Sequence, residues 1–106
     1  MTEKRKPTYD LGAFKQAFST VASLNVTGTA LRTAFELGFG RAEIVSIIQA
    51  MLPNHFYKSM TSNADYRVWQ DVYHVPSDAG MLYIKFTADA LTSFLLLSFK
   101  ENENYG

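Results

Sequence analysis

The fold of this chain is decided by two stretches, residues 56–76 (FYKSMTSNADYRVWQDVYHVP) and residues 81–100 (MLYIKFTADALTSFLLLSFK). Both are rich in aromatic and β-branched residues, which favour strands. Turn-forming residues separate the segments, and because such connections are short we expect neighbouring strands to run antiparallel. The predicted strands are Phe56–Met60, Tyr66–Val75, Met81–Thr87 and Leu91–Lys100.

The residues before these stretches have helical spacing. Apolar residues recur every three or four positions, and each run begins at a capping residue or ends at a helix-breaking one. Leu24–Val26 is expected to be a short extended piece. We predict helices from Leu11 (capped by Asp10) through Val21, from Thr27 or Thr29 to Leu37 with Gly38 after its end, and from Arg41 to Met51 before Pro53.

Three helices followed by several strands predict an α+β fold, with the helices packed on one face of a mainly antiparallel sheet. The length fits one domain over residues 1–106. The apolar run Phe94–Phe99 is typical of a central strand. Residues 1–8 and 101–106 are polar, and we expect loose tails there. The basic residues 4–6 have a second interpretation, as an arm that touches nucleic-acid phosphate.

The composition limits the classes of function. Ten Lys and Arg balance ten Asp and Glu, so the net charge is zero, whereas nucleic-acid-binding proteins usually carry a basic excess. Any RNA site must therefore be a local arrangement. There is no cysteine, which excludes a disulfide framework and a thiol nucleophile and fits a cytoplasmic protein. No apolar segment follows the charged start, so we expect no signal peptide, and no run is long enough to span a membrane.

Alternation along the strands separates two faces. Leu82, Ile84 and Phe86 should lie under the helices, which leaves Tyr83 and Lys85 on the opposite, open face. Phe56, Lys58 and Met60 should share one face of their strand. If Lys58 and Gln70 use the same open face, then Lys58, Gln70, Tyr83 and Lys85 gather on neighbouring strands. With strands about 4.8 Å apart, such a cluster would fit one ribose-phosphate unit.

This set of side chains suits cleavage of RNA by its own 2′-hydroxyl, which needs a base, an acid and positive charge for the phosphorane oxygens. Lys58 can act as base or cation, Tyr83 can donate a proton, and Gln70 can orient an oxygen. Without further support, the same residues are typical of an ordinary solvated strand face.

The other candidates are contacts rather than catalysts. Arg67 is either a phosphate contact or a solvated strand arginine, and Tyr73 can stack on a base. His74 titrates near neutrality, but it precedes the predicted turn at Pro76, so we expect a substrate contact at most. The predicted substrate-binding residues are Met60, Arg67, Tyr73, His74 and Lys85. The two histidines have no metal-ligand spacing, and we expect no metal and no cofactor.

Four strings, FYKSMT, WQDVY, LYIK and LLLSFKE, in this order and near this spacing, resemble the motility quorum-sensing regulator toxin family (MqsR). The resemblance is dense over residues 56–101 and weaker in the early KRKPTY segment and the helix ending in ELG. It implies a RelE-like fold and an mRNA interferase. It places the family's active-site lysine, glutamine and tyrosine on Lys58, Gln70 and Tyr83.

The resemblance also implies the biology of a type II toxin–antitoxin system. The substrate would be single-stranded mRNA, cut without metal at GCU-like sites, and the partner a zinc-binding helix-turn-helix antitoxin resembling MqsA. We expect no membrane association and no direct DNA binding. The alternative from another class is a non-catalytic module that binds an antitoxin or RNA and regulates transcription indirectly, which the zero net charge favours.

Overall fold

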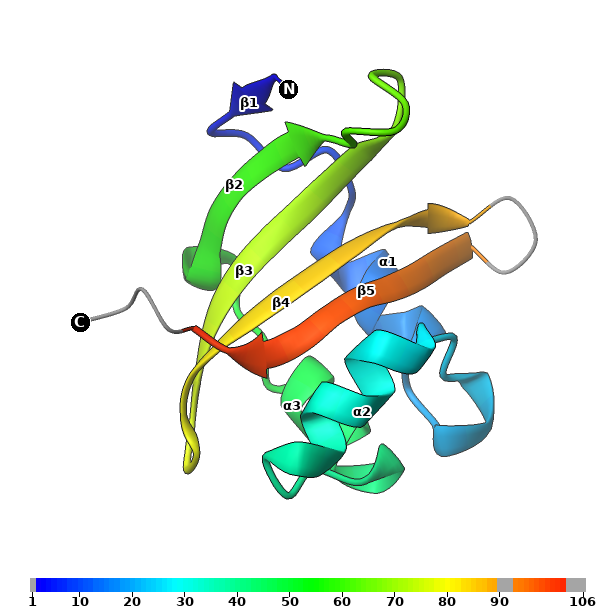
Figure 1. Cartoon of the computed structure of the whole chain (residues 1–106), viewed down its shortest axis with the longest axis vertical. Coiled ribbons are helices and arrows are strands. Elements are labelled where there is room, and N and C mark those ends of the chain that lie inside the picture. Colours follow the sequence, from blue (N-terminus) through cyan, green and yellow to red (C-terminus); the bar gives the residue numbers. More distant parts are fainter. Residues whose placement is uncertain (1, 90–92, 103–106) are drawn as a thin grey trace.

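The computed structural model describes residues 2–89 and 93–102, and the predicted helices and strands occur in the predicted order, with one further strand before them (Figure 1). None of the described helices is long and apolar enough to cross a membrane. The helices are α1 (Leu11–Ala17), α2 (Gly28–Glu36) and α3 (Arg41–Gln49), with 3₁₀ turns at Val21–Ser23 and Pro53–His55.

The strands form one antiparallel sheet in the order β1-β2-β3-β4-β5, in which each strand pairs with its neighbours in sequence. Three helices and an antiparallel sheet confirm the predicted α+β class. The strands are β1 (Glu3–Lys4), β2 (Phe56–Thr61), β3 (Trp69–Ser77), β4 (Gly80–Asp89) and β5 (Ser93–Glu101).

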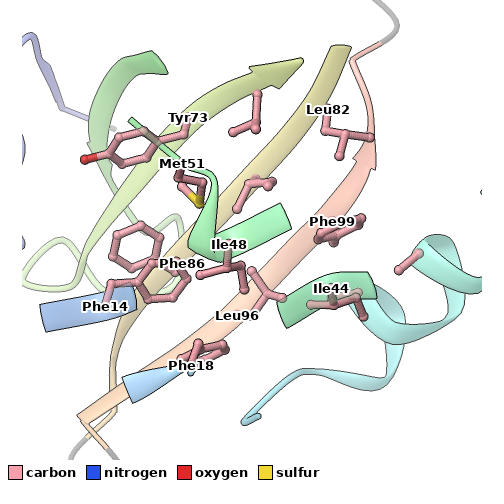
Figure 2. Packing of buried hydrophobic residues seen from close by; sticks show 14 residues of the cluster. Phe14, Phe18, Ile44, Ile48, Met51, Tyr73, Leu82, Phe86, Leu96 and Phe99 are labelled. Carbon is pink, nitrogen blue, oxygen red and sulfur yellow. The ribbon is translucent and has the colours of Figure 1, made fainter. Parts of the chain in front are cut away.

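The hydrophobic core joins all three helices to one set of strand side chains (Figure 2). The predicted residues Leu82, Ile84 and Phe86 are fully buried in it. The rings of Phe14 on α1 and Phe86 on β4 stack face to face with centroids 3.7 Å apart. Burial of such large side chains supplies most of the stabilisation of a domain this size, at roughly 1.5–3 kcal/mol each.

The helix ends follow the capping residues, with one exception. Asp10 Oδ2 accepts a hydrogen bond from the Ala13 N–H at 2.8 Å, and Thr27 is the cap of α2, as its hydroxyl accepts from the Ala30 N–H. Gly38 has φ +90°, as the position after a helix end requires. The first helix, however, ends at Ala17 rather than near Val21, because the hydroxyls of residues 20 and 23 bond to nearby backbone and start a separate turn.

β3 begins and ends later than predicted. The segment before Trp69 is a turn, in which the Asp65 carboxylate accepts from the Arg67 N–H and the Val68 N–H donates to the Asp65 carbonyl. At the other end the strand continues through Pro76 to Ser77, and Gly80 at φ +99° closes the hairpin. His74 therefore lies inside a strand, away from the turn.

β5 is an edge strand, which corrects the prediction of a central strand. Its apolar run has another cause, because the edge is covered by preceding segments. Leu96 exchanges hydrogen bonds with the backbone of residues 25 and 27, and the Thr33 hydroxyl of α2 donates to the Phe99 carbonyl at 2.6 Å. Covered edges do not pair with other chains. The predicted strand start at Leu91 lies outside the described residues.

The N-terminal segment is part of the sheet, which corrects the prediction of a loose tail over residues 1–8. β1 pairs with β2, and Thr2 exchanges hydrogen bonds with Thr61. The buried Asp71 carboxylate accepts from the Thr8 and Tyr9 N–H groups at 2.9–3.1 Å. Residues 2–9 are therefore fixed at both ends. At the other terminus Glu101 belongs to β5, and residues 103–106 lie outside the described part.

Candidate functional site

The sheet face opposite the core carries rows of side chains that follow from the strand register, and three neighbouring rows form the candidate site. Residues that face each other across antiparallel strands form a row, and rows lie about 7 Å apart along the strands. We call this surface the open face. The first row is Glu3, Met60, Gln70, Thr87 and Leu95; the second is Lys58, Val72, Lys85 and Ser98; the third is His74, Tyr83 and Lys100.

A β-bulge at Tyr57 changes which side chains reach the open face. The register of β2 against β3 shifts between Phe56 and Lys58. Phe56 therefore packs on the core side, 5.4 Å from the Tyr73 ring, and not with Lys58 and Met60 as predicted. The extra residue, Tyr57, stacks on His74 with ring centroids 4.2 Å apart. A bulge leaves no mark in the alternation, so the stacking of Tyr57 on His74 could not be predicted from the sequence.

Lys58 lies on β2, at one end of the second row. Its Nζ lies 2.6 Å from the Glu3 carboxylate of β1, so it is held as the cationic half of an ion pair. Val72, its partner on the adjacent strand β3, is fully buried although it is on the open face. Long lysine side chains from both sides of Val72 can cover it with their apolar stems and keep the ammonium groups in water.

The third row places two titratable rings side by side. The His74 and Tyr83 rings lie 6.1 Å apart between centroids, and Lys100 Nζ is 5.2 Å from the centre of the Tyr83 ring. Together with the stacked Tyr57, this forms an aromatic surface flanked by cations. Such a surface can hold a nucleobase by stacking and a phosphate by charge.

The surroundings shift the proton affinities of these groups. Burial lowers the pKa of His74, and the nearby Lys58 ammonium lowers it further. Burial raises the pKa of Tyr83; Lys58 opposes that shift, whereas Tyr57 and Glu3 add to it. Burial, and then Lys100, lowers the pKa of Lys85. At neutral pH His74 is therefore a neutral imidazole and Tyr83 a protonated phenol.

The fold brings together some of the predicted residues and separates others. Lys58, Lys85 and Tyr83 lie in adjacent rows of the open face, with His74 beside them. Gln70 is on the same face but two rows from Tyr83, which is roughly 13 Å along the strands. The prediction that all four fit one ribose-phosphate unit is therefore wrong, and Gln70 faces a different part of any bound strand.

The remaining candidates lie in three environments. Met60 is in the first row and only 9% exposed. Arg67 is in the turn before β3, where its guanidinium binds the Asp65 carboxylate at 3.1 Å. Tyr73 points into the core with 1% exposure, on the face away from Lys58, so we leave it out of the candidate site.

Three residues of the open face were missed by the sequence reasoning, namely Glu3, Tyr57 and Lys100. Glu3 was assigned to a loose tail. Lys100 lies on the same face as Tyr83 and is directly opposite it in the register. A second register shift, between β4 and β5 near Phe86, hides this position from simple alternation along the last strand. Within the described residues no group of three His, Asp or Glu side chains could hold a metal ion.

Comparison with known proteins adds to this geometry. The model of one family, described as "Motility quorum-sensing regulator, toxin of MqsA", matches residues 6–101. The chain belongs to this family. It is also similar to the mRNA interferase toxin MqsR of Escherichia coli (strain K12), with 35% identity over 99 residues, covering 93% of this chain and 98% of that protein. The predicted resemblance is confirmed.

The matched residues of this chain include all three helices. They include β2 to β5, and so most of the three rows. Glu3 and strand β1 lie before the matched segment, although β1 completes the sheet beside Lys58. The contribution of β1 to the open face is therefore visible only in the tertiary structure.

Proposed function

We propose that this protein is the toxin of a type II toxin–antitoxin system and an endoribonuclease that cleaves single-stranded mRNA. The name of the Escherichia coli relative, mRNA interferase toxin, supports this activity. The observation that carries it here is the cluster of Lys58, Lys85 and Tyr83 on the open face, because cations and a protonated phenol side by side suit a phosphodiester.

In this proposal the substrate supplies the nucleophile. The ribose 2′-hydroxyl attacks the adjacent phosphorus, and the 5′-oxygen leaves, so no metal is needed. Lys58, held as a cation beside Glu3, opposes the charge that develops on the phosphorane oxygens. Tyr83 donates to the leaving oxygen. Lys85 neutralises phosphate, and Gln70, two rows away, orients a neighbouring nucleotide.

Further parts of the proposal come from the family. We propose GCU-like cleavage sites, a cytoplasmic location where mRNA is available, and a zinc-binding antitoxin as the partner, in line with the family description as the toxin of MqsA. We also propose a RelE-like arrangement in which the helices cover a single sheet face. The single core cluster that joins all three helices to Leu82, Ile84 and Phe86 supports this.

The test is cleavage of one defined RNA oligonucleotide with EDTA present. Wild type should cut RNA, leave DNA intact and produce a 2′,3′-cyclic phosphate and a 5′-hydroxyl. Lys58→Ala and Tyr83→Phe should slow cleavage by roughly two to four orders of magnitude, the usual range for electrostatic and acid–base groups. Gln70→Ala should mainly raise KM, because its row is distant from the reacting phosphate.

The matched control is Lys15→Ala, which removes a lysine from α1, where its Nζ donates to the Met51 carbonyl. It should cut at the wild-type rate, and thermal melts of all variants show whether they fold. If folded wild type cuts no RNA but binds an antitoxin, the chain is the non-catalytic module considered above. If Lys58→Ala and Tyr83→Phe both cut normally, the active site is elsewhere.

A further inference from the structure

The proposed reaction needs a group that accepts the 2′-hydroxyl proton, and the predicted catalytic residues do not supply one. Lys58 is held as the cation of the Glu3 ion pair. Tyr83, with its raised pKa, keeps its proton at neutral pH. Gln70 has no titratable group and is two rows away. The acceptor must be another residue of the second or third row.

His74 occupies the required position. It faces Tyr83 across β3 and β4, with 6.1 Å between ring centroids. The base must reach the 2′-oxygen and the acid the 5′-oxygen of one phosphodiester, each through a hydrogen bond of about 3 Å. The separation of the His74 and Tyr83 rings fits this arrangement. On its other side the imidazole stacks on Tyr57 at 4.2 Å, and this contact fixes the plane of the ring.

The nitrogens of His74 are available to a substrate. Within the described residues, neither ring nitrogen has a hydrogen-bond partner, and the side chain is only partly buried. The other histidine, His55, differs in both respects: it lies in a 3₁₀ turn before β2, and its Nδ1 accepts from the Leu52 N–H at 3.0 Å. Burial and Lys58 lower the pKa of His74, so its imidazole is neutral at neutral pH and can accept a proton from the substrate.

We propose that His74 is the general base of the cleavage reaction. This inference rests on the proposed function. A His74 nitrogen takes the 2′-hydroxyl proton as the 2′-oxygen forms a bond to phosphorus. The bond from phosphorus to the 5′-oxygen breaks, and that oxygen takes the Tyr83 proton. The products are a 2′,3′-cyclic phosphate and a 5′-hydroxyl, and proton transfer from the imidazolium to the phenolate through solvent restores the enzyme.

The charged groups around His74 set the expected pH dependence. Lys58 and Tyr57 approach it from β2, Tyr83 and Lys85 from β4, with Lys100 beyond on β5 and Glu3 bound to Lys58. Cations outnumber the single carboxylate, so they disfavour the imidazolium. The rate should therefore rise with pH and reach its plateau with an inflection below the ordinary histidine value of about 6.5.

The experiment measures kcat and KM of full-length His74→Gln and His74→Ala from pH 5 to 8.5 on an oligonucleotide with one cleavage site. His74→Gln keeps a polar side chain but cannot take the proton. We expect kcat to fall by roughly two to four orders of magnitude, KM to change little, and the acidic inflection to disappear. Added imidazole should raise the cleavage rate of His74→Ala at least about tenfold. A purely structural role of His74 would not allow this rescue.

The matched control is His55→Gln, which removes the chain's other histidine and should keep both the rate and the inflection. A His74→Gln variant that cuts within threefold of wild type, or one that changes only KM, would overturn the inference and leave His74 as a contact. That failure is distinct from failure of the proposed function, because Lys58→Ala would then still be inactive while wild type cuts RNA.

Discussion

Tyr73 and Tyr83 show how the pleat of a sheet gives one residue type two different roles. They lie on adjacent strands and face opposite sides of the sheet. Tyr73 is 1% exposed and packs against Phe56 and Phe86, whereas Tyr83 lies on the open face beside His74. The sequence interpretation placed Tyr73 away from Gln70 yet kept it as a base-stacking candidate, which its burial argues against.

At the residue scale we predict that Tyr73 limits stability in alkali. Burial, with smaller contributions from Asp71 and Asp10, raises the pKa of Tyr73 to about 12 from its ordinary value of 10. As the pH rises, the Tyr73 phenol therefore ionises in the unfolded chain before it ionises in the folded one. The stability that this group contributes is fully present below pH 10 and is lost as the pH rises towards 12. Tyr73→Phe should lose less stability than wild type over this range, measured by urea unfolding from pH 8 to 11.5.

The control for this prediction is Tyr66→Phe. Tyr66 is 80% exposed in the turn before β3, so its removal should leave the alkaline loss unchanged. Other groups titrate above pH 10 in every variant, and the comparison between the two tyrosines cancels them. Equal loss in wild type and Tyr73→Phe would contradict the assignment.

At the scale of the elements, α2 and the residue before it cover part of the outer edge of β5. The Thr33 hydroxyl donates to the Phe99 carbonyl at 2.6 Å, and Thr27 donates to the Leu97 carbonyl at 3.3 Å. We predict that Thr33→Val, which keeps the shape but removes the hydroxyl, leaves the Phe99 carbonyl without this donor. The loss should be about 1–3 kcal/mol of unfolding free energy, measured by thermal or urea unfolding.

Thr29→Val is the matched control, since Thr29 is an exposed threonine one turn earlier on the same helix. It should change stability by no more than about 0.5 kcal/mol, the usual range for surface substitutions. If both variants lose the same free energy, the cause is helix propensity rather than the contact with β5. In that case the covering of the sheet edge does not depend on this hydrogen bond.

At the scale of the whole molecule, the proposed RNA binding by a chain of zero net charge requires a local group of cations. The open face gathers Lys58, Lys85 and Lys100 from three strands. Contacts to three phosphates of a single strand predict a slope of about −2 for log K against log salt. A fluorescent oligonucleotide with 2′-O-methyl riboses, which cannot be cleaved, measures this between 50 mM and 500 mM salt.

The basic residues of the N-terminal segment provide the contrast. Lys4 lies with its Nζ 4.2 Å above the Trp69 ring, on the core side of the sheet rather than on the open face. Lys4→Ala should therefore leave the salt slope unchanged, whereas Lys85→Ala should reduce its magnitude by about 0.7. A slope much steeper than −2 would indicate that residues 4–6 also bind phosphate.

Local patterns in the sequence predicted the class of fold, the order of the elements after β1 and the buried face of β4. Helical and two-residue periods are local properties, so the stripe of Phe14 and Phe18 and the buried trio of Leu82, Ile84 and Phe86 could be predicted from spacing alone. The position of Tyr83 on the face opposite Ile84 also follows from alternation, whereas only the register of the strands puts Lys58 on that face. Family resemblance added the interpretation of those residues as an active site.

Which residues meet on that face depends on the tertiary structure. The bulge at Tyr57 and the extension of β3 past Pro76 place His74 between Tyr57 and Tyr83, and neither has a local signal. Glu3 reaches Lys58 because Thr61 and Asp71 fix a segment some 60 residues away in the chain. Register and edge pairing depend on contacts between distant segments, and periodicity within one segment carries no information about them.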